Sequence, residues 1–169
     1  MMTSTNLILT QKQTQQKIKR IAFEIYEHNF AEEEIILAGI YDKGYRFAQL
    51  LQAEFNALSP VRSRLVKVSL DKLAPLQGEI ELDCDPEILR HKCIVLFDDV
   101  LNTGRTLIYS LKPFLSLDIK KLQTAVLVDR GHKLFPVSAD YVGYALSTTL
   151  NEHVEVILDE GDTFGVYLH

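Results

Sequence analysis

Residues 94–106 constrain the fold more than any other stretch of the chain. Residues 94–97 are all apolar and read as a short buried strand, and two adjacent carboxylates, Asp98 and Asp99, follow at its carboxyl end. A loop of small residues, 102–106, then opens onto a helical pattern. Ligands of open α/β sheets bind beyond the carboxyl ends of strands, and free N–H groups at a helix start suit a phosphate. Acids beside a phosphate cradle therefore predict a sugar phosphate, with the carboxylates on its hydroxyls.

The remaining patterns alternate between helix and strand. After a capping box at Thr10 and Gln13, apolar spacing predicts helices over 11–29, 44–58 and 107–115, the last with a kink or boundary at Pro113. Short apolar runs predict strands over 35–40, 65–70, 94–97 and 124–128, followed by a hairpin of 154–158 with 165–168. Such alternation predicts an α/β fold with a mostly parallel sheet covered on both faces.

Size and composition narrow the class of protein. A chain of 169 residues, 47% hydrophobic and 24% charged, is expected to fold as a single domain over 1–169 with an ordinary core. Its apolar runs are far shorter than the roughly 20 residues of a membrane helix, and no secretory signal pattern is visible. Cys84 and Cys93 lack metal or redox spacing, which predicts reduced thiols in a cytoplasmic protein. The net charge of −5 argues mildly against a dedicated nucleic-acid binder, although a local basic patch is compatible with it.

Three segments resemble one known family. Residues 95–106, Val-Leu-Phe-Asp-Asp-Val-Leu-Asn-Thr-Gly-Arg-Thr, resemble the phosphoribosyl-pyrophosphate signature of type I phosphoribosyltransferases. Residues 126–141, Val-Leu-Val-Asp-Arg-Gly-His-Lys-Leu-Phe-Pro-Val-Ser-Ala-Asp-Tyr, are similar to a segment of the pyrimidine-operon regulator/uracil phosphoribosyltransferase branch. Residues 39–44, Gly-Ile-Tyr-Asp-Lys-Gly, resemble the pyrophosphate loop of that branch. The similarity is weakest between residues 60 and 90. It implies the type I phosphoribosyltransferase fold, a mostly parallel central sheet flanked by helices, with a small hood supplied by segments near 1–10 and 134–169.

The resemblance also implies a role for each motif. The catalytic acids would hold the ribose of phosphoribosyl pyrophosphate, and the loop after them would cradle its 5′-phosphate; these residues are Asp98, Asp99, Asn102, Thr103, Gly104, Arg105 and Thr106. The pyrophosphate loop would be Tyr41, Asp42, Lys43 and Gly44, with Lys43 where the family more often has arginine. Backbone groups of Val128, Asp129 and Arg130 would read the edge of the base, whereas His132 is a weak catalytic candidate. Mg²⁺ would be held mainly by substrate and water, so no protein ligand is assigned.

Three functions stay open at this level. The first is an enzyme that transfers the phosphoribosyl group to a nucleobase, uracil above all, giving UMP and pyrophosphate. The second is an RNA-binding regulator of pyrimidine genes, using the basic residues Lys12, Lys17, Lys19, Arg20, Arg130, His132 and Lys133, although Phe23 and Ser138 replace polar or basic residues of those regulators. The third is a weakly active or non-catalytic nucleotide sensor, because 70–78 is shorter than the family's closing loop and lacks its Tyr and Arg. The family commonly forms dimers or tetramers.

Overall fold

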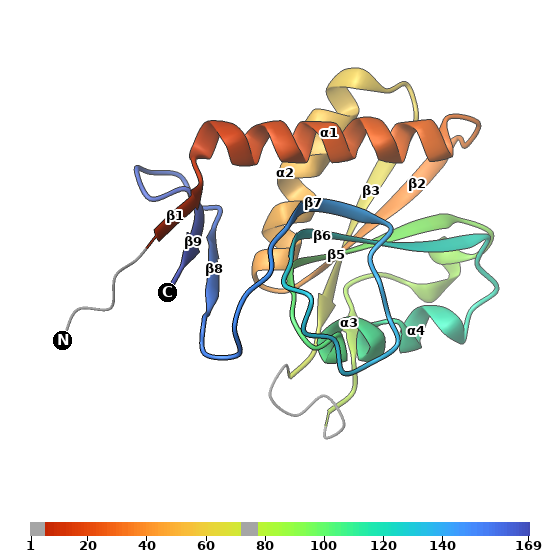
Figure 1. Cartoon of the computed structure of the whole chain (residues 1–169). Helices are drawn as coiled ribbons and strands as arrows, with labels where there is room; N and C mark the ends of the chain where they lie inside the picture. The colour runs from red at the N-terminus through yellow and green to blue at the C-terminus, as the bar shows by residue number, and fades with distance from the viewer. Residues whose placement is uncertain (1–5, 72–77) are drawn as a thin grey trace.

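A six-stranded sheet forms the centre of the molecule in the computed structural model, which describes residues 6–71 and 78–169 (Figure 1). Its strands run in the order β4-β3-β2-β5-β6-β7, where these are β2 (Glu34–Ile40), β3 (Arg62–Ser69), β4 (Glu81–Leu82), β5 (Cys93–Leu101), β6 (Lys121–Asp129) and β7 (Tyr141–Ala145). The short β4 is antiparallel to β3, and the other neighbouring strands of this sheet are parallel. The α/β fold with a mostly parallel sheet is therefore confirmed.

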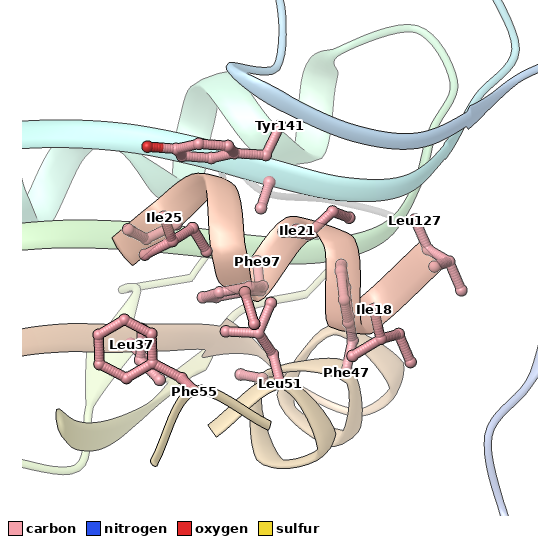
Figure 2. Close-up of a cluster of buried hydrophobic side chains, with 14 of the residues drawn as sticks. Ile18, Ile21, Ile25, Leu37, Phe47, Leu51, Phe55, Phe97, Leu127 and Tyr141 are labelled. Atoms are coloured by element: carbon pink, nitrogen blue, oxygen red, sulfur yellow. The ribbon is translucent and has the colours of Figure 1, made fainter. Parts of the chain in front are cut away.

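Helices cover both faces of this sheet, as the alternation in β2 requires. Ile35 and Leu37 pack with α1 (Gln11–Asn29) and α2 (Lys43–Leu58), whereas Ile36 and Ala38 join the cluster beneath α3 (Arg105–Ser110) and α4 (Lys112–Leu115). Figure 2 shows the first cluster, whose labelled members are Ile18, Ile21, Ile25, Leu37, Phe47, Leu51, Phe55, Phe97, Leu127 and Tyr141.

Local signals set the helix ends as predicted. The Thr10 side chain accepts from the Gln13 N–H at 3.1 Å, and Gln13 Oε1 accepts from the Thr10 N–H at 2.9 Å, so the capping box that begins α1 is confirmed. Pro113 does mark a boundary, because α3 ends at Ser110 and α4 begins at Lys112. A short 3₁₀ helix, η1 (Pro86–Leu89), was not among the predicted elements.

A small antiparallel sheet forms the hood, with the order β1-β9-β8. It consists of β1 (Asn6–Leu9), β8 (Val154–Ile157) and β9 (Gly165–Leu168), so the predicted late hairpin is confirmed. Its buried residues Leu9, Val156 and Val166 belong to the same core cluster as α1 and α2. The hood therefore packs onto the main body rather than standing apart from it.

Two expectations need correction. Residues 141–145 do not belong to the hood: they form β7, which extends the main sheet parallel to β6. Gly143 interrupts the apolar pattern there because a β-carbon would lie 2.5 Å from the Leu127 carbonyl oxygen. β5 is longer than 94–97, so Asp98 and Asp99 lie within the strand, with Asp98 opposite Val126 of β6. Residues 72–77, most of the shortened loop, lie outside the described residues.

Candidate functional site

A cavity of about 470 Å³ opens where β5 ends. The structure brings the two acids, the loop after them, one lysine of α2 and three hood residues around it; the lining is Lys43, Asp98, Asp99, Val100, Leu101, Asn102, Thr103, Gly104, Arg105, Thr106, Leu107, Val126, His153, Val154 and Glu155. The main sheet, α2, α3 and the hood thus each supply part of one site. This is the carboxyl edge of the parallel strands, where ligands of open α/β sheets bind.

The two acids differ in their surroundings. Asp98 is only 4% exposed, and its Oδ1 accepts from the Asp99 N–H at 2.9 Å, which fixes the carboxylate against the backbone. Asp99 is half-buried. Both border the cavity, so one carboxylate is held firmly and the other is more open to a ligand.

The first turn of α2 lies directly on the acid-bearing strand. A β-carbon at Gly44 would lie 2.6 Å from the Phe97 carbonyl oxygen and 3.3 Å from Asp98 Oδ1, so only glycine allows this approach. The adjacent Tyr41–Asp42 peptide bond is cis. Of the residues predicted for the pyrophosphate loop, Lys43 lines the cavity, whereas the exposed Tyr41 lies under the Lys67 ammonium, 5.2 Å from its ring centroid.

The loop before α3 is shaped by its glycine and by a neighbouring segment. Gly104, at the N-cap of α3, has φ of 87°, and a β-carbon there would lie 2.6 Å from Val137 Cγ1. The Thr103 carbonyl accepts from the N–H groups of Leu134 and Phe135 at 2.7 and 3.1 Å. Thr103 Oγ1 in turn accepts from the Arg105 N–H at 3.2 Å. The segment around Leu134 and Phe135 therefore holds the loop in place by hydrogen bonds, and the loop itself lines the cavity.

Arg130 joins the site loops to the hood. Its Nη1 donates to Asn102 Oδ1 at 2.9 Å, and its Nε donates to Thr148 Oγ1 at 3.1 Å. Its Nη2 donates to the carbonyls of Thr149 at 3.2 Å and Glu152 at 2.6 Å. One guanidinium thus connects the loop after β5 with the segment that leads into β8. Asn102 is engaged by this contact, so its side chain helps to position the loop.

The segment predicted to read the base lies beside the cavity, and Val128, Asp129 and Arg130 are not among its lining residues. Val128 is fully buried and pairs in register with Val100 and Tyr144. Asp129 Oδ1 accepts from the Gly131 N–H at 2.9 Å and shapes the turn. His132 Nε2 contacts the carbonyl oxygen and the hydroxyl of Thr148, so this side chain has a structural role in linking the loop after β6 to the segment before β8.

Sequence reasoning did not single out the hood residues of the site. His153 and Glu155 lie two apart around β8, so they share one face of the strand. The alternation of apolar and polar residues predicts a strand with one polar face. It does not predict which cavity that face will line. Glu155 Oε1 lies 3.4 Å from His169 Nε2, so the last residue of the chain also lies near this wall.

One shifted pKa lies near the hood wall of the site. Hydrogen bonds from Thr149, the N–H first and then the hydroxyl, lower the pKa of Glu152 below its usual range, and the Arg130 charge adds to this.

Within residues 6–71 and 78–169, no group of three or more His, Cys, Asp and Glu side chains is arranged to hold a metal. In the same ranges, no helix is long and apolar enough to cross a membrane.

Residues 4–160 match the sequence model of the phosphoribosyl transferase domain. This chain belongs to the type I phosphoribosyltransferase family. The chain is 34% identical over 168 residues to the bifunctional protein PyrR of Clostridium kluyveri, covering 92% of each chain. It is 33% identical over 166 residues to PyrR of Haemophilus ducreyi, covering 92% of this chain and 91% of that protein.

Solved structures of the same fold superimpose on this chain. The hypoxanthine phosphoribosyltransferase of Trypanosoma cruzi superimposes with a TM-score of 0.79 at 19% identity, covering 96% of this chain and 95% of that one. A hypoxanthine-guanine phosphoribosyltransferase of Bacillus anthracis gives 0.73 at 19% identity, covering 97% and 98%. At this identity the likeness concerns the fold alone.

Proposed function

We propose that this phosphoribosyltransferase binds phosphoribosyl pyrophosphate with Mg²⁺ and transfers the phosphoribosyl group to uracil, giving UMP and pyrophosphate. The observation that carries the proposal is the cavity that Asp98, Asp99, the loop 102–106 and Lys43 share. A ribose on the acids would put its 5′-phosphate at the loop and its pyrophosphate toward Lys43. The ribose, the 5′-phosphate and the pyrophosphate would thus each meet a wall of suitable chemistry: carboxylates, backbone N–H groups and a lysine.

The two acids would do the electrostatic work. Breaking the bond between C1 and pyrophosphate develops positive charge on the ribose, and fixed carboxylates beside the ring stabilise that charge. Asp98 is suited to this because its Oδ1 is already oriented by the Asp99 N–H. The more open Asp99 would accept hydrogen bonds from the ribose hydroxyls. When bound, Mg²⁺ neutralises charge on the departing pyrophosphate, and the donor set of two carboxylates fits an ion that keeps most of its ligands from substrate and water.

Uracil is the proposed acceptor because residues 126–141 resemble the uracil-using branch, and because PyrR proteins align with more than nine-tenths of the chain. Turnover with Mg²⁺, phosphoribosyl pyrophosphate and a panel of bases tests this, with product nucleotides separated by chromatography. UMP is expected as the main product. Ligand binding without any nucleotide product would leave the third possibility, a non-catalytic nucleotide sensor.

Matched variants connect turnover to the site. Asp99→Asn is expected to lower kcat by about 10²–10³ because it removes a charge beside the developing cation. Asp118→Asn is the control, since Asp118 is an exposed acid whose nearest partner is His91 on the surface. Equal activity in the wild type and Asp99→Asn would contradict the proposed role of the acid.

RNA regulation is a second possibility, and the contacts of the basic residues weigh against it. Arg20 Nη2 donates to the carbonyls of Val142 and Gly143, Lys17 lies 5.8 Å from the ring centroid of Tyr144, and Arg130 is committed to the hood. A phosphate backbone would have to compete for these groups. Titration with pyrimidine-operon leader RNA at low and high salt tests the idea, and no binding at low salt would end it.

A further inference from the structure

A second cavity of about 260 Å³ adjoins the first turn of α2. It is enclosed by one side of that turn and by the end of β8 with the residues after it; the lining is Asp42, Lys43, Arg46, Val156, Ile157, Leu158 and Asp159. Lys43 lines both this cavity and the main one, so it stands at their common border. None of the sequence motifs pointed to Arg46.

We propose that Arg46 binds the leaving pyrophosphate in this second cavity, beside Lys43. The inference rests on the proposed function, because it takes the ribose to lie on Asp98 and Asp99. From there a pyrophosphate on C1 that reaches Lys43 arrives at the border of the second cavity, where Arg46 is the next cation. Arg46 and Lys43 are three residues apart on α2, so both project from the same side of its first turn.

The chemistry of Arg46 suits this position. A lysine binds phosphate as a point charge, whereas the planar guanidinium offers a bidentate fork. Arg46, three residues after Lys43 on α2, would offer the fork that the lysine lacks. Its Nε donates to the Leu158 carbonyl at 3.2 Å, which fixes the plane of the guanidinium against the hood. Arg46 also lines the second cavity, so its side chain borders the space between α2 and the segment after β8.

Two carboxylates also line the cavity, Asp42 and Asp159. A bare pyrophosphate would be repelled by them, but a pyrophosphate that enters with Mg²⁺ brings a cation which carboxylates approach directly or through its water ligands. The mixed lining therefore fits the magnesium complex of pyrophosphate better than a free phosphate.

Calorimetry on the full chain with three probes tests the inference: phosphoribosyl pyrophosphate, inorganic pyrophosphate and UMP, each with Mg²⁺. Arg46→Gln is expected to lower the affinities for phosphoribosyl pyrophosphate and for pyrophosphate by about 10- to 100-fold. Charge-assisted hydrogen bonds usually contribute a binding free energy of that size. UMP carries no pyrophosphate, so its affinity should stay within about twofold. Arg62→Gln is the control. It removes an exposed arginine at the start of β3 that lines neither cavity, and it should change none of the three affinities.

The outcomes separate the alternatives. Wild-type affinity for pyrophosphate in Arg46→Gln overturns the inference, and so does an equal loss of UMP affinity, which would mean that Arg46 acts by holding the hood. Arg46→Lys provides a second variant, expected to keep part of the pyrophosphate affinity; full affinity would show that the fork is not needed. A wild-type protein that binds pyrophosphate but neither UMP nor phosphoribosyl pyrophosphate would contradict the proposed function and leave Arg46 as a pyrophosphate-binding residue.

Discussion

Arg130 Nη1 donates to Asn102 Oδ1 at 2.9 Å, and this bond joins the loops that follow two neighbouring strands. The same guanidinium reaches the carbonyls of Thr149 and Glu152, close to where the hood strand β8 begins. The phosphate-side loop and the hood wall of the cavity are therefore positioned by one side chain. Its effect on a ligand would be indirect, through the loops it holds.

Replacing Arg130 should loosen both walls together. Arg130→Gln is expected to lower the free energy of unfolding by about 1–3 kcal/mol, because several charge-assisted hydrogen bonds are lost at once. KM for phosphoribosyl pyrophosphate should rise as the loop at Asn102 loses its restraint. Arg130→Lys should not restore either property, since one ammonium cannot reach all four acceptors. Denaturant unfolding and steady-state kinetics provide the two readouts.

Arg90→Gln is the matched control for this prediction. Arg90 is paired with Glu87 on an exposed surface, where such pairs contribute little, and the change should stay within about 0.5 kcal/mol. Equal stability of Arg130→Gln and the wild type would show that the contacts of Arg130 do not hold the hood.

A methyl group at Gly44 should separate α2 from the acid-bearing strand. Because the obstacle is the Phe97 carbonyl oxygen at 2.6 Å, which is backbone, Gly44→Ala is expected to cost about 1–3 kcal/mol of stability and to weaken phosphoribosyl pyrophosphate binding. Gly78→Ala is the control, because a β-carbon there meets open space. Thermal unfolding and calorimetry should rank the two variants clearly; similar behaviour would mean that α2 tolerates a shift.

The two acids should respond differently to substitution. Asp98→Asn keeps an oxygen for the Asp99 N–H, whereas Asp98→Ala leaves that amide without this acceptor and should cost about 1–3 kcal/mol of stability. Both changes remove the charge, so both should abolish most turnover. Asp99→Asn should lower turnover and cost less stability than Asp98→Ala, because asparagine keeps a carbonyl oxygen in the place of the carboxylate. Unfolding curves for the three variants test this, and a stable Asp98→Ala protein would contradict it.

Stability near the hood should depend on pH through Glu152. Its pKa is lowered in the folded state by hydrogen bonds from Thr149, so its contribution is complete above the usual glutamate pKa near 4.5 and is lost as pH falls through the lowered folded-state value. Glu152→Gln should therefore be less stable than the wild type at neutral pH, and the difference should vanish in acid. Melting temperatures from pH 3 to 7 measure this.

Glu27→Gln, which changes an exposed glutamate of α1, is the control for the pH series. The pH dependence of its melting temperature should follow that of the wild type. A Glu152→Gln protein with the same pH profile as the wild type would show that the turn at Thr149 does not depend on the carboxylate.

The sequence alone determined the elements that local chemistry specifies. The capping box at Thr10, the boundary at Pro113 and the buried run before Asp98 are local signals, and each appears in the structure where it was predicted. The loop 102–106 could likewise be recognised as one segment because its residues are contiguous. Periodicity and capping depend on neighbours within a few residues, which is why they can be read from the chain.

Tertiary structure decided which distant segments share the cavity. No local pattern predicted that β7 would join the main sheet despite Gly143. Nor did one predict that His153 and Glu155, before and within β8, would line the same cavity as the acids of β5. The sequence also could not predict that Arg46 lines a second cavity, because β8 and the residues after it form the other wall of that cavity. These relations come from packing the hood and α2 against the same core, and such long-range packing leaves no periodic trace in the sequence.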